Sequence, residues 1–135
     1  MKSKMYKLET TTTFDAAHYL PEYNGKCKNL HGHTWKVKVI VYKNDLNNNF
    51  VVDFSVIKKV IHTFDHKCLN EFLTNPTAEN IAKYLYNAIK AVITEEAKTV
   101  NDLIGLVIKV WETEDNSVAY TENDLFLVMG NKDDL

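Results

Sequence analysis

Hydrophobic and polar residues alternate along two stretches near the start of the chain, residues 5–14 (MYKLETTTTF) and 33–42 (HTWKVKVIVY). In the second stretch a tryptophan and valines occupy every other position, and Lys36 and Lys38 stand between them. Alternation with a period of two places apolar side chains on one face of a strand. We therefore predict two half-buried strands of an antiparallel sheet.

Two later stretches have apolar residues at helical spacing. The first, FSVIKKVIHTF, follows Asp53, which is a favourable N-cap residue. The second spans residues 75–93 and carries the longest apolar stripe in the chain. There Asn75 is suited to cap the helix and Pro76 to occupy its first helical position.

The remaining apolar stretches, residues 103–114 and 117–129, are predicted to be strands. The element order is therefore strand, strand, helix, helix, strand, strand. This order predicts an α+β fold, a four-stranded antiparallel sheet with two helices packed on one face.

Composition and charge narrow the class of protein. The 135 residues are 45% hydrophobic and 25% charged, which predicts one globular domain over residues 1–135. With 16 basic and 18 acidic residues, the chain lacks the basic excess typical of nucleic-acid binding, so no nucleic-acid partner is expected. No apolar run approaches the roughly 20 residues of a membrane span, and no signal peptide is evident, so a cytoplasmic protein with reduced cysteines is expected.

The segment CKNLHGH, residues 27–33, is the clearest candidate for chemistry. His31 and His33 are two residues apart at the start of a predicted strand, so both point to one face. His18 has the parity of the apolar positions in the first strand and would join them if the two strands pair. Three imidazoles with one open position are typical of a catalytic zinc site, although loop histidines bonded to backbone remain the alternative.

Cys27 has two possible roles beside such a site. As a fourth ligand it would close the metal site and make it structural. As a thiolate beside a dication and two lysines it could act as a base or nucleophile. The other cysteine, Cys68, lies in an amphipathic stretch and is interpreted as a core residue.

Three acidic or basic residues elsewhere are weaker candidates. Asp65 and His66 are adjacent, and a carboxylate that orients an imidazole suits proton transfer near neutral pH. Glu112 ends an apolar strand and could bind a ligand edge with two N–H donors, such as that of a pterin or guanine. Its position and spacing alone favour an ordinary solvated glutamate.

Six motifs in order, FDAAH, CKNLHGH, VVDF, FDHKCLN, PTAEN and VWETE, resemble the family of 6-pyruvoyltetrahydropterin synthase and 6-carboxytetrahydropterin synthase. The resemblance covers nearly the whole chain. It implies the tunnelling fold, assembled as a homohexamer of two trimers with active sites at subunit interfaces. It also implies a small-molecule pterin substrate and a lyase reaction.

The resemblance assigns roles to individual residues. It implies Zn2+ on His18, His31 and His33, with Cys27 as the catalytic thiol rather than a ligand. It implies a proton relay of Asp65 and His66 from a neighbouring subunit. It also implies that three residues bind the pterin: Glu112 anchors the ring, and Thr77 and Glu79 line the pocket.

The short spacing of three residues between Cys27 and His31 resembles the bacterial branch that serves queuosine biosynthesis. That branch converts 7,8-dihydroneopterin triphosphate to 6-carboxy-5,6,7,8-tetrahydropterin and releases acetaldehyde and triphosphate. The 6-pyruvoyl product of the biopterin branch is the alternative. A non-catalytic zinc and pterin-binding protein, or a hydrolase that uses zinc-bound hydroxide, are alternatives from other classes.

Overall fold

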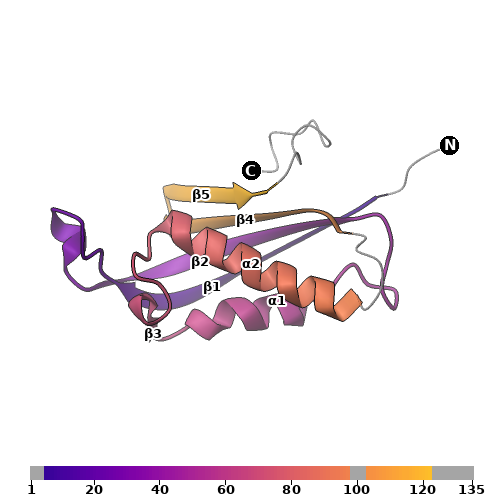
Figure 1. The fold of residues 1–135 in the computed structure, drawn as a ribbon, viewed down its shortest axis with the longest axis horizontal. Coiled ribbons are helices and arrows are strands. Elements are labelled where there is room, and N and C mark those ends of the chain that lie inside the picture. The colour runs from indigo at the N-terminus through magenta and orange to yellow at the C-terminus, as the bar shows by residue number, and fades with distance from the viewer. Residues whose placement is uncertain (1–4, 98–102, 123–135) are drawn as a thin grey trace.

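The computed structural model describes residues 5–97 and 103–122 of the chain. One mixed sheet has the strand order β3-β1-β2-β4-β5, and both helices lie on one side of it (Figure 1). Its elements are β1 (Tyr6–His18), η1 (Lys26–Lys28), β2 (His31–Lys43), α1 (Phe54–Ile61), η2 (His62–Phe64), β3 (Lys67–Cys68), η3 (Leu69–Glu71), α2 (Ala78–Ala97), β4 (Leu103–Thr113) and β5 (Asn116–Thr121).

The α+β class and the element order are confirmed, with one difference in the sheet. The sequence predicts four antiparallel strands, whereas the sheet has a fifth, β3, which pairs in parallel with β1 at Ala16 and Ala17. A strand of two residues has no alternation that a sequence pattern could reveal. The last predicted strand is found in part as β5, and its residues 123–129 lie outside the described ranges.

Strand parity decides which side chains face the helices. In β1 the even positions Leu8, Phe14 and Ala16 are buried, and in β2 the odd positions from Trp35 to Val41 are fully buried. These side chains pack against helix residues such as Ile57 and Leu85 in one core cluster. From Val39 to Lys43 both faces of β2 are buried, so the half-buried prediction holds only for its first half.

The first helix begins as predicted. The Oδ1 atom of Asp53 accepts a hydrogen bond from the backbone N–H of Ser55 at 2.9 Å, which satisfies one free donor of the first turn of α1. None of the helices within residues 5–97 and 103–122 is long and apolar enough to cross a membrane.

The start of the second helix differs from the prediction. The Oγ1 atom of Thr77, not the Asn75 side chain, accepts from the N–H of Asn80 at 3.2 Å, and the carbonyl of Thr77 accepts the bond from Ile81 N at 2.9 Å. Pro76 is buried ahead of the helix rather than within its first turn. Thr77 is therefore the N-cap residue of α2.

Replacing Thr77 with alanine is expected to lower the free energy of unfolding by about 1 kcal/mol, because the first turn of α2 loses a capping acceptor. Urea denaturation would measure the loss. Thr77→Ser keeps the hydroxyl and should recover most of it. Equal stability of the alanine and wild-type proteins would show that the cap contributes nothing.

Candidate metal centre and active site

Three histidines meet at the end of the sheet, on the face that the helices cover. His18 ends β1 and lies opposite His31, which begins β2, in the antiparallel register. His33 has the same parity as His31, so all three rings point to one side. The His18 and His31 ring centroids are 4.5 Å apart, and those of His31 and His33 are 4.9 Å apart. The buried indole of Trp35 lies beneath His18 and His33 and separates the cluster from the core.

Backbone carbonyls set the tautomers of two of these imidazoles. The Nδ1 atom of His18 lies 2.8 Å from the carbonyl oxygen of Pro76, and that of His31 lies 2.7 Å from the carbonyl oxygen of Asn29. A carbonyl only accepts, so each Nδ1 donates and each neutral ring keeps its lone pair on Nε2. This outer hydrogen bond is typical of metal-bound histidines.

The two Nε2 atoms then face each other at 3.0 Å. Two lone pairs at this distance repel unless a cation lies between them. In a tetrahedral zinc site, ligands at 2.0–2.1 Å from the metal are roughly 3.3 Å apart. The separation of the two nitrogens is thus close to what a bound metal requires.

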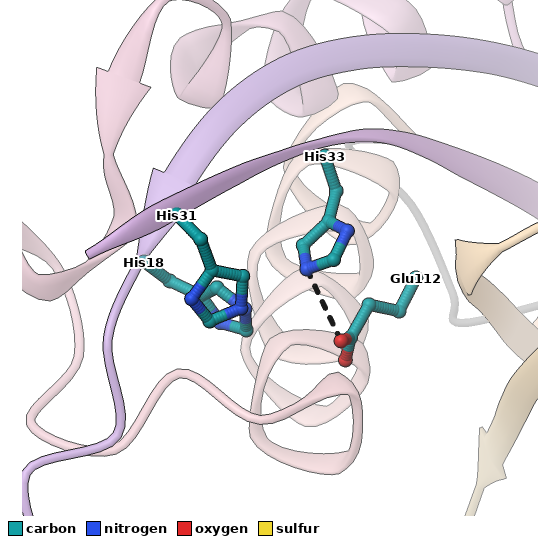
Figure 2. A group of neighbouring side chains, drawn as sticks. All are labelled: His18, His31, His33 and Glu112. Carbon is teal, nitrogen blue, oxygen red and sulfur yellow. Dashed lines mark hydrogen bonds and ion pairs between the residues drawn. The ribbon is translucent and has the colours of Figure 1, made fainter. Parts of the chain in front are cut away.

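Glu112 belongs to β4, and Figure 2 shows its carboxylate next to the ring of His33. Its Oε1 atom lies 3.2 Å from Nε2 of His33. Despite this short distance, the Nε2 atom is buried and has no hydrogen-bond partner among the described residues. The two atoms are therefore close to each other, but no hydrogen bond joins them.

Burial keeps two of the imidazoles neutral. Desolvation lowers the pKa of His18 below its usual value, and the Pro76 carbonyl and the Glu112 carboxylate oppose this shift only in part. Desolvation likewise lowers the pKa of His33, with Glu112 again opposing it. Both rings are therefore uncharged at pH 7 and retain lone pairs for a metal.

The residues present fit a zinc ion. Ligand atoms of His18, His31, His33 and Glu112 all lie within 4.8 Å of one another. Imidazole nitrogens together with one carboxylate are a ligand set that zinc accepts. Cys27 is not part of this group within the described ranges, which disfavours its role as the fourth ligand.

Cys27 lies on the loop between β1 and β2, within the short helix η1, and is partly buried. The loop extends away from the sheet beyond the histidine end of the two strands (Figure 1). Its base is closed by a hydrogen bond from the N–H of Leu20 to the carbonyl of Cys27 at 2.8 Å. The thiol is thus carried on a segment anchored directly after His18.

Asp65 and His66 do not join the cluster within this chain. They are held against Asp15, because Asp65 Oδ1 accepts from Asp15 N at 2.9 Å and His66 N donates to Asp15 O at 2.7 Å. The His66 side chain is 79% exposed, lies 3.5 Å from the Asp65 carboxylate, and has a left-handed backbone with φ of 59°.

The exposed imidazole of His66 borders the open face of the sheet. There it lines a depression of about 620 Å3, which is also lined by Asp15, Ala16, Ala17, Gly32, His33, Thr34, Lys67 and Cys68. Asp15 and Ala17 point to the face opposite His18, because neighbouring strand residues alternate. Within one chain His66 is therefore outside the group of converging ligand atoms, although His33 borders the same depression.

The other predicted residues have mixed outcomes. Thr77 is partly buried and caps α2, and Glu79 is exposed on the first turn of that helix. Cys68 is only partly buried, and its thiol lies 3.7 Å from Asn70 Oδ1, so its interpretation as a core residue is wrong. Cys68 belongs to the edge strand β3, where burial is incomplete.

Asn70 is a residue that the sequence analysis missed. Its Oδ1 atom accepts from the N–H of Tyr19 at 3.0 Å, and its Nδ2 atom donates to the carbonyl of Tyr19 at 2.9 Å. The amide therefore continues the pairing of β1 beyond β3 and fixes the backbone directly after His18. Asn70 lies within the short helix η3, and its neighbours in sequence gave no sign of this contact, which joins residues far apart in the chain.

Replacing Asn70 with alanine is expected to destabilise the protein by about 1–3 kcal/mol, since two hydrogen bonds worth about 0.5–1.5 kcal/mol each are lost. Urea unfolding would measure the change, and faster amide exchange at Tyr19 would locate it. Asn70→Asp keeps the acceptor and loses the donor, so it should fall between the two. An unaltered exchange rate of the Tyr19 amide in both variants would show that Asn70 does not hold the Tyr19 backbone in place.

Comparison with known proteins shows which family has a sequence and a fold similar to those of this chain. Residues 7–123 match the family described as 6-pyruvoyl tetrahydropterin synthase. The 6-carboxy-5,6,7,8-tetrahydropterin synthase of Bacillus subtilis is 34% identical over 99 residues, which cover 65% of this chain and 68% of that protein. The enzyme of the same name from Haemophilus influenzae is 32% identical over 142 residues and covers 87% of this chain and 100% of the relative.

Two further comparisons show the range of the family. The dihydroneopterin monophosphate aldolase of Pyrococcus furiosus is 34% identical over 90 residues, covering 64% of this chain and 76% of that protein. The structure of Caenorhabditis elegans 6-pyruvoyl tetrahydropterin synthase matches with a TM-score of 0.70 at 27% identity and covers 91% of this chain and all of that one.

Together with these matches, the sheet and the histidine cluster at its end indicate a pterin synthase-like enzyme. The chain belongs to the 6-pyruvoyl tetrahydropterin synthase family. The resemblance inferred from the six motifs is thereby confirmed, as are the fold class and the expectation of a lyase-type enzyme.

Proposed function

We propose that the protein converts 7,8-dihydroneopterin triphosphate to 6-carboxy-5,6,7,8-tetrahydropterin, with release of acetaldehyde and triphosphate, in queuosine biosynthesis. The observation that carries the proposal is the convergence of the His18, His31 and His33 rings, with the Nε2 lone pairs of His18 and His31 facing each other. Relatives with the carboxytetrahydropterin synthase name support this reaction over others in the family.

In this proposal His18, His31 and His33 hold Zn2+. When bound, the metal supplies Lewis acidity for the hydroxyls of the substrate side chain. The carbonyls of Pro76 and Asn29 keep the first two rings in the tautomer that can bind it. Trp35 closes the cluster off from the core and keeps the rings in place.

Glu112 is the proposed anchor for the pterin ring. Its carboxylate is 30% exposed and lies beside the histidines, so a ligand can reach it while it stays near the reacting atoms. Two carboxylate oxygens match the two adjacent N–H donors of the 2-amino-4-oxo edge of a pterin. Thr77 and Glu79, at the start of α2, are proposed to line the same pocket.

The proton transfers are assigned to Cys27 and to the pair Asp65 and His66. Cys27 would take a proton from the substrate side chain as thiolate, and His66 would transfer another while Asp65 orients its ring. His66 is outside the group of converging ligand atoms of its own chain, so we propose that a neighbouring subunit of a homohexamer, built from two trimers, supplies it.

Mixing two inactive variants tests the shared site. Cys27→Ala and His66→Ala subunits, unfolded and refolded together, are expected to regain a fraction of wild-type turnover, because some sites combine an intact Cys27 with an intact His66. Each variant refolded alone should stay inactive. Failure of the mixture to exceed the two separate samples, with mixed oligomers shown by mass spectrometry, would contradict sharing between subunits.

The reaction itself is tested by incubating the zinc-loaded protein with 7,8-dihydroneopterin triphosphate and identifying products by mass spectrometry. Carboxytetrahydropterin with acetaldehyde supports the proposal. A 6-pyruvoyl product would place the protein in the biopterin branch. Turnover of dihydroneopterin monophosphate alone would favour the aldolase reaction, which the relative from Pyrococcus furiosus motivates. Zinc binding without any turnover would favour a binding protein.

A further inference from the structure

Glu112 occupies a position that pterin anchoring alone does not explain. Its carboxylate lies 3.2 Å from a nitrogen of His33, and its ligand atom falls within the same 4.8 Å group as those of the three histidines (Figure 2). A residue reserved for the far edge of a bicyclic substrate has no need to point at the metal ligands. The carboxylate therefore lies among the candidate metal ligands in the protein without substrate.

The course of β4 brings Glu112 there. Ile108 and Val110 of β4 are buried against the helices, and Glu112 follows them with the same parity. The pairing with β5 shifts register between Trp111 and Thr113, where the strand ends. The side chain thus leaves the core face at the level of Trp35 and is 30% exposed.

The contact between Glu112 and His33 leaves the hydrogen-bonding capacity of the imidazole nitrogen unsatisfied. The Nε2 atom of His33 is buried and makes no hydrogen bond within the described ranges, although the carboxylate oxygen is near. His33 is also the one side chain paired with Glu112 in those ranges. A cation held by both groups satisfies the nitrogen and the carboxylate together. Three histidines and one carboxylate form a complete four-coordinate zinc set.

We infer that Glu112 is the fourth metal ligand of the substrate-free protein and that pterin binding withdraws it. This inference rests on the proposed function, in which the same carboxylate binds the two N–H donors of the pterin. Engaging both oxygens with the pterin edge removes them from the metal. Recognition of the ring would then free the coordination position that the side-chain hydroxyls need. Until that exchange the site is closed to water and small anions.

The cobalt-substituted protein tests this without turnover, because Co2+ has visible absorption that reports its ligands. Azide should bind to the metal of Glu112→Gln at least about 10-fold more tightly than to that of the wild type, because it no longer competes with a carboxylate for the fourth coordination position. Glu114→Gln removes an exposed acid two residues away and should behave as wild type. Glu112→Asp, one methylene shorter, should resemble the glutamine variant.

A second titration tests the withdrawal. Adding 7,8-dihydroneopterin, which lacks the triphosphate, to the wild-type cobalt protein should shift its spectrum and raise its azide affinity toward that of Glu112→Gln. Identical spectra and azide affinities in the wild type and both Glu112 variants would overturn the ligand assignment. A wild-type spectrum that dihydroneopterin leaves unaltered, at concentrations where fluorescence shows it bound, would overturn the exchange.

These outcomes are separable from the proposed reaction. The wild type could form product from 7,8-dihydroneopterin triphosphate while the Glu112 variants match it in cobalt spectrum and azide affinity. That result would support the proposed function and overturn the inference about Glu112. Opening of the metal site in Glu112→Gln, without any product from the wild type, would support the ligand role and overturn the proposed function.

Discussion

Replacing His31 with alanine is expected to lower the affinity of the protein for zinc by at least about 100-fold, because the loss of a mere supporting group already costs 10–100-fold. Only His18 and His33 would remain as imidazole ligands, and the Nε2 atom of His18 would lose its facing partner at 3.0 Å. Competition with a chromophoric chelator, or the zinc content after dialysis, would measure the change.

The fold should survive this substitution, since His31 is at the start of β2 and only partly buried. His62→Ala is the matched control: it removes an exposed imidazole that contacts Thr12 at 2.9 Å, away from the cluster. Zinc binding by this control should equal that of the wild type. Full zinc occupancy in His31→Ala would mean that His31 is not a ligand.

Replacing Cys27 with alanine is expected to reduce kcat by about 10²–10⁴-fold, the contribution typical of a positioned acid or base. Zinc should remain bound, because the thiol is outside the group of converging ligand atoms. Steady-state turnover of the triphosphate substrate and metal analysis of the same sample would measure both effects.

Cys68→Ala serves as the control for thiol removal, since Cys68 is partly exposed and its thiol, 3.7 Å from Asn70 Oδ1, is outside the group of converging ligand atoms. It should keep near-normal turnover. Loss of zinc in Cys27→Ala would return Cys27 to the role of a structural ligand. Undiminished turnover would instead favour chemistry by metal-activated water, which does not require a thiol.

Residues whose role follows from local periodicity were predictable from the sequence. The parity of His18 with Phe14 and of His33 with Trp35 correctly placed the three histidines on one face, since strands alternate regardless of context. The cap at Asp53 is likewise local, because its acceptor and the donor Ser55 are two residues apart. Such features depend on a few neighbouring residues and hence leave a readable pattern.

Features that depend on contacts between distant segments were missed. Strand β3, at residues 67–68, is defined by its pairing with Ala16 and Ala17, which the sequence does not signal. Pro76 was assigned to a helix, yet its carbonyl accepts a hydrogen bond from the imidazole of His18, 58 residues away in the sequence. The position of Glu112 had a local clue, because it continues the parity of Ile108 and Val110, but its nearness to His33 depended on how β4 pairs with β2.

The alternation of β1 has a consequence for the evolution of chain length in this protein. The backbone of Asp15 holds the Asp65–His66 segment, and the side chain of His18 joins the cluster. Because the two residues are three positions apart in β1, their side chains point to opposite faces of the sheet. Insertion of a single residue between them would turn one of the two to the wrong side. Residues 19–30, by contrast, lie between β1 and β2, so added length there leaves the parity of both strands unchanged. Gains and losses of residues should therefore accumulate in that loop and be absent from residues 15–18.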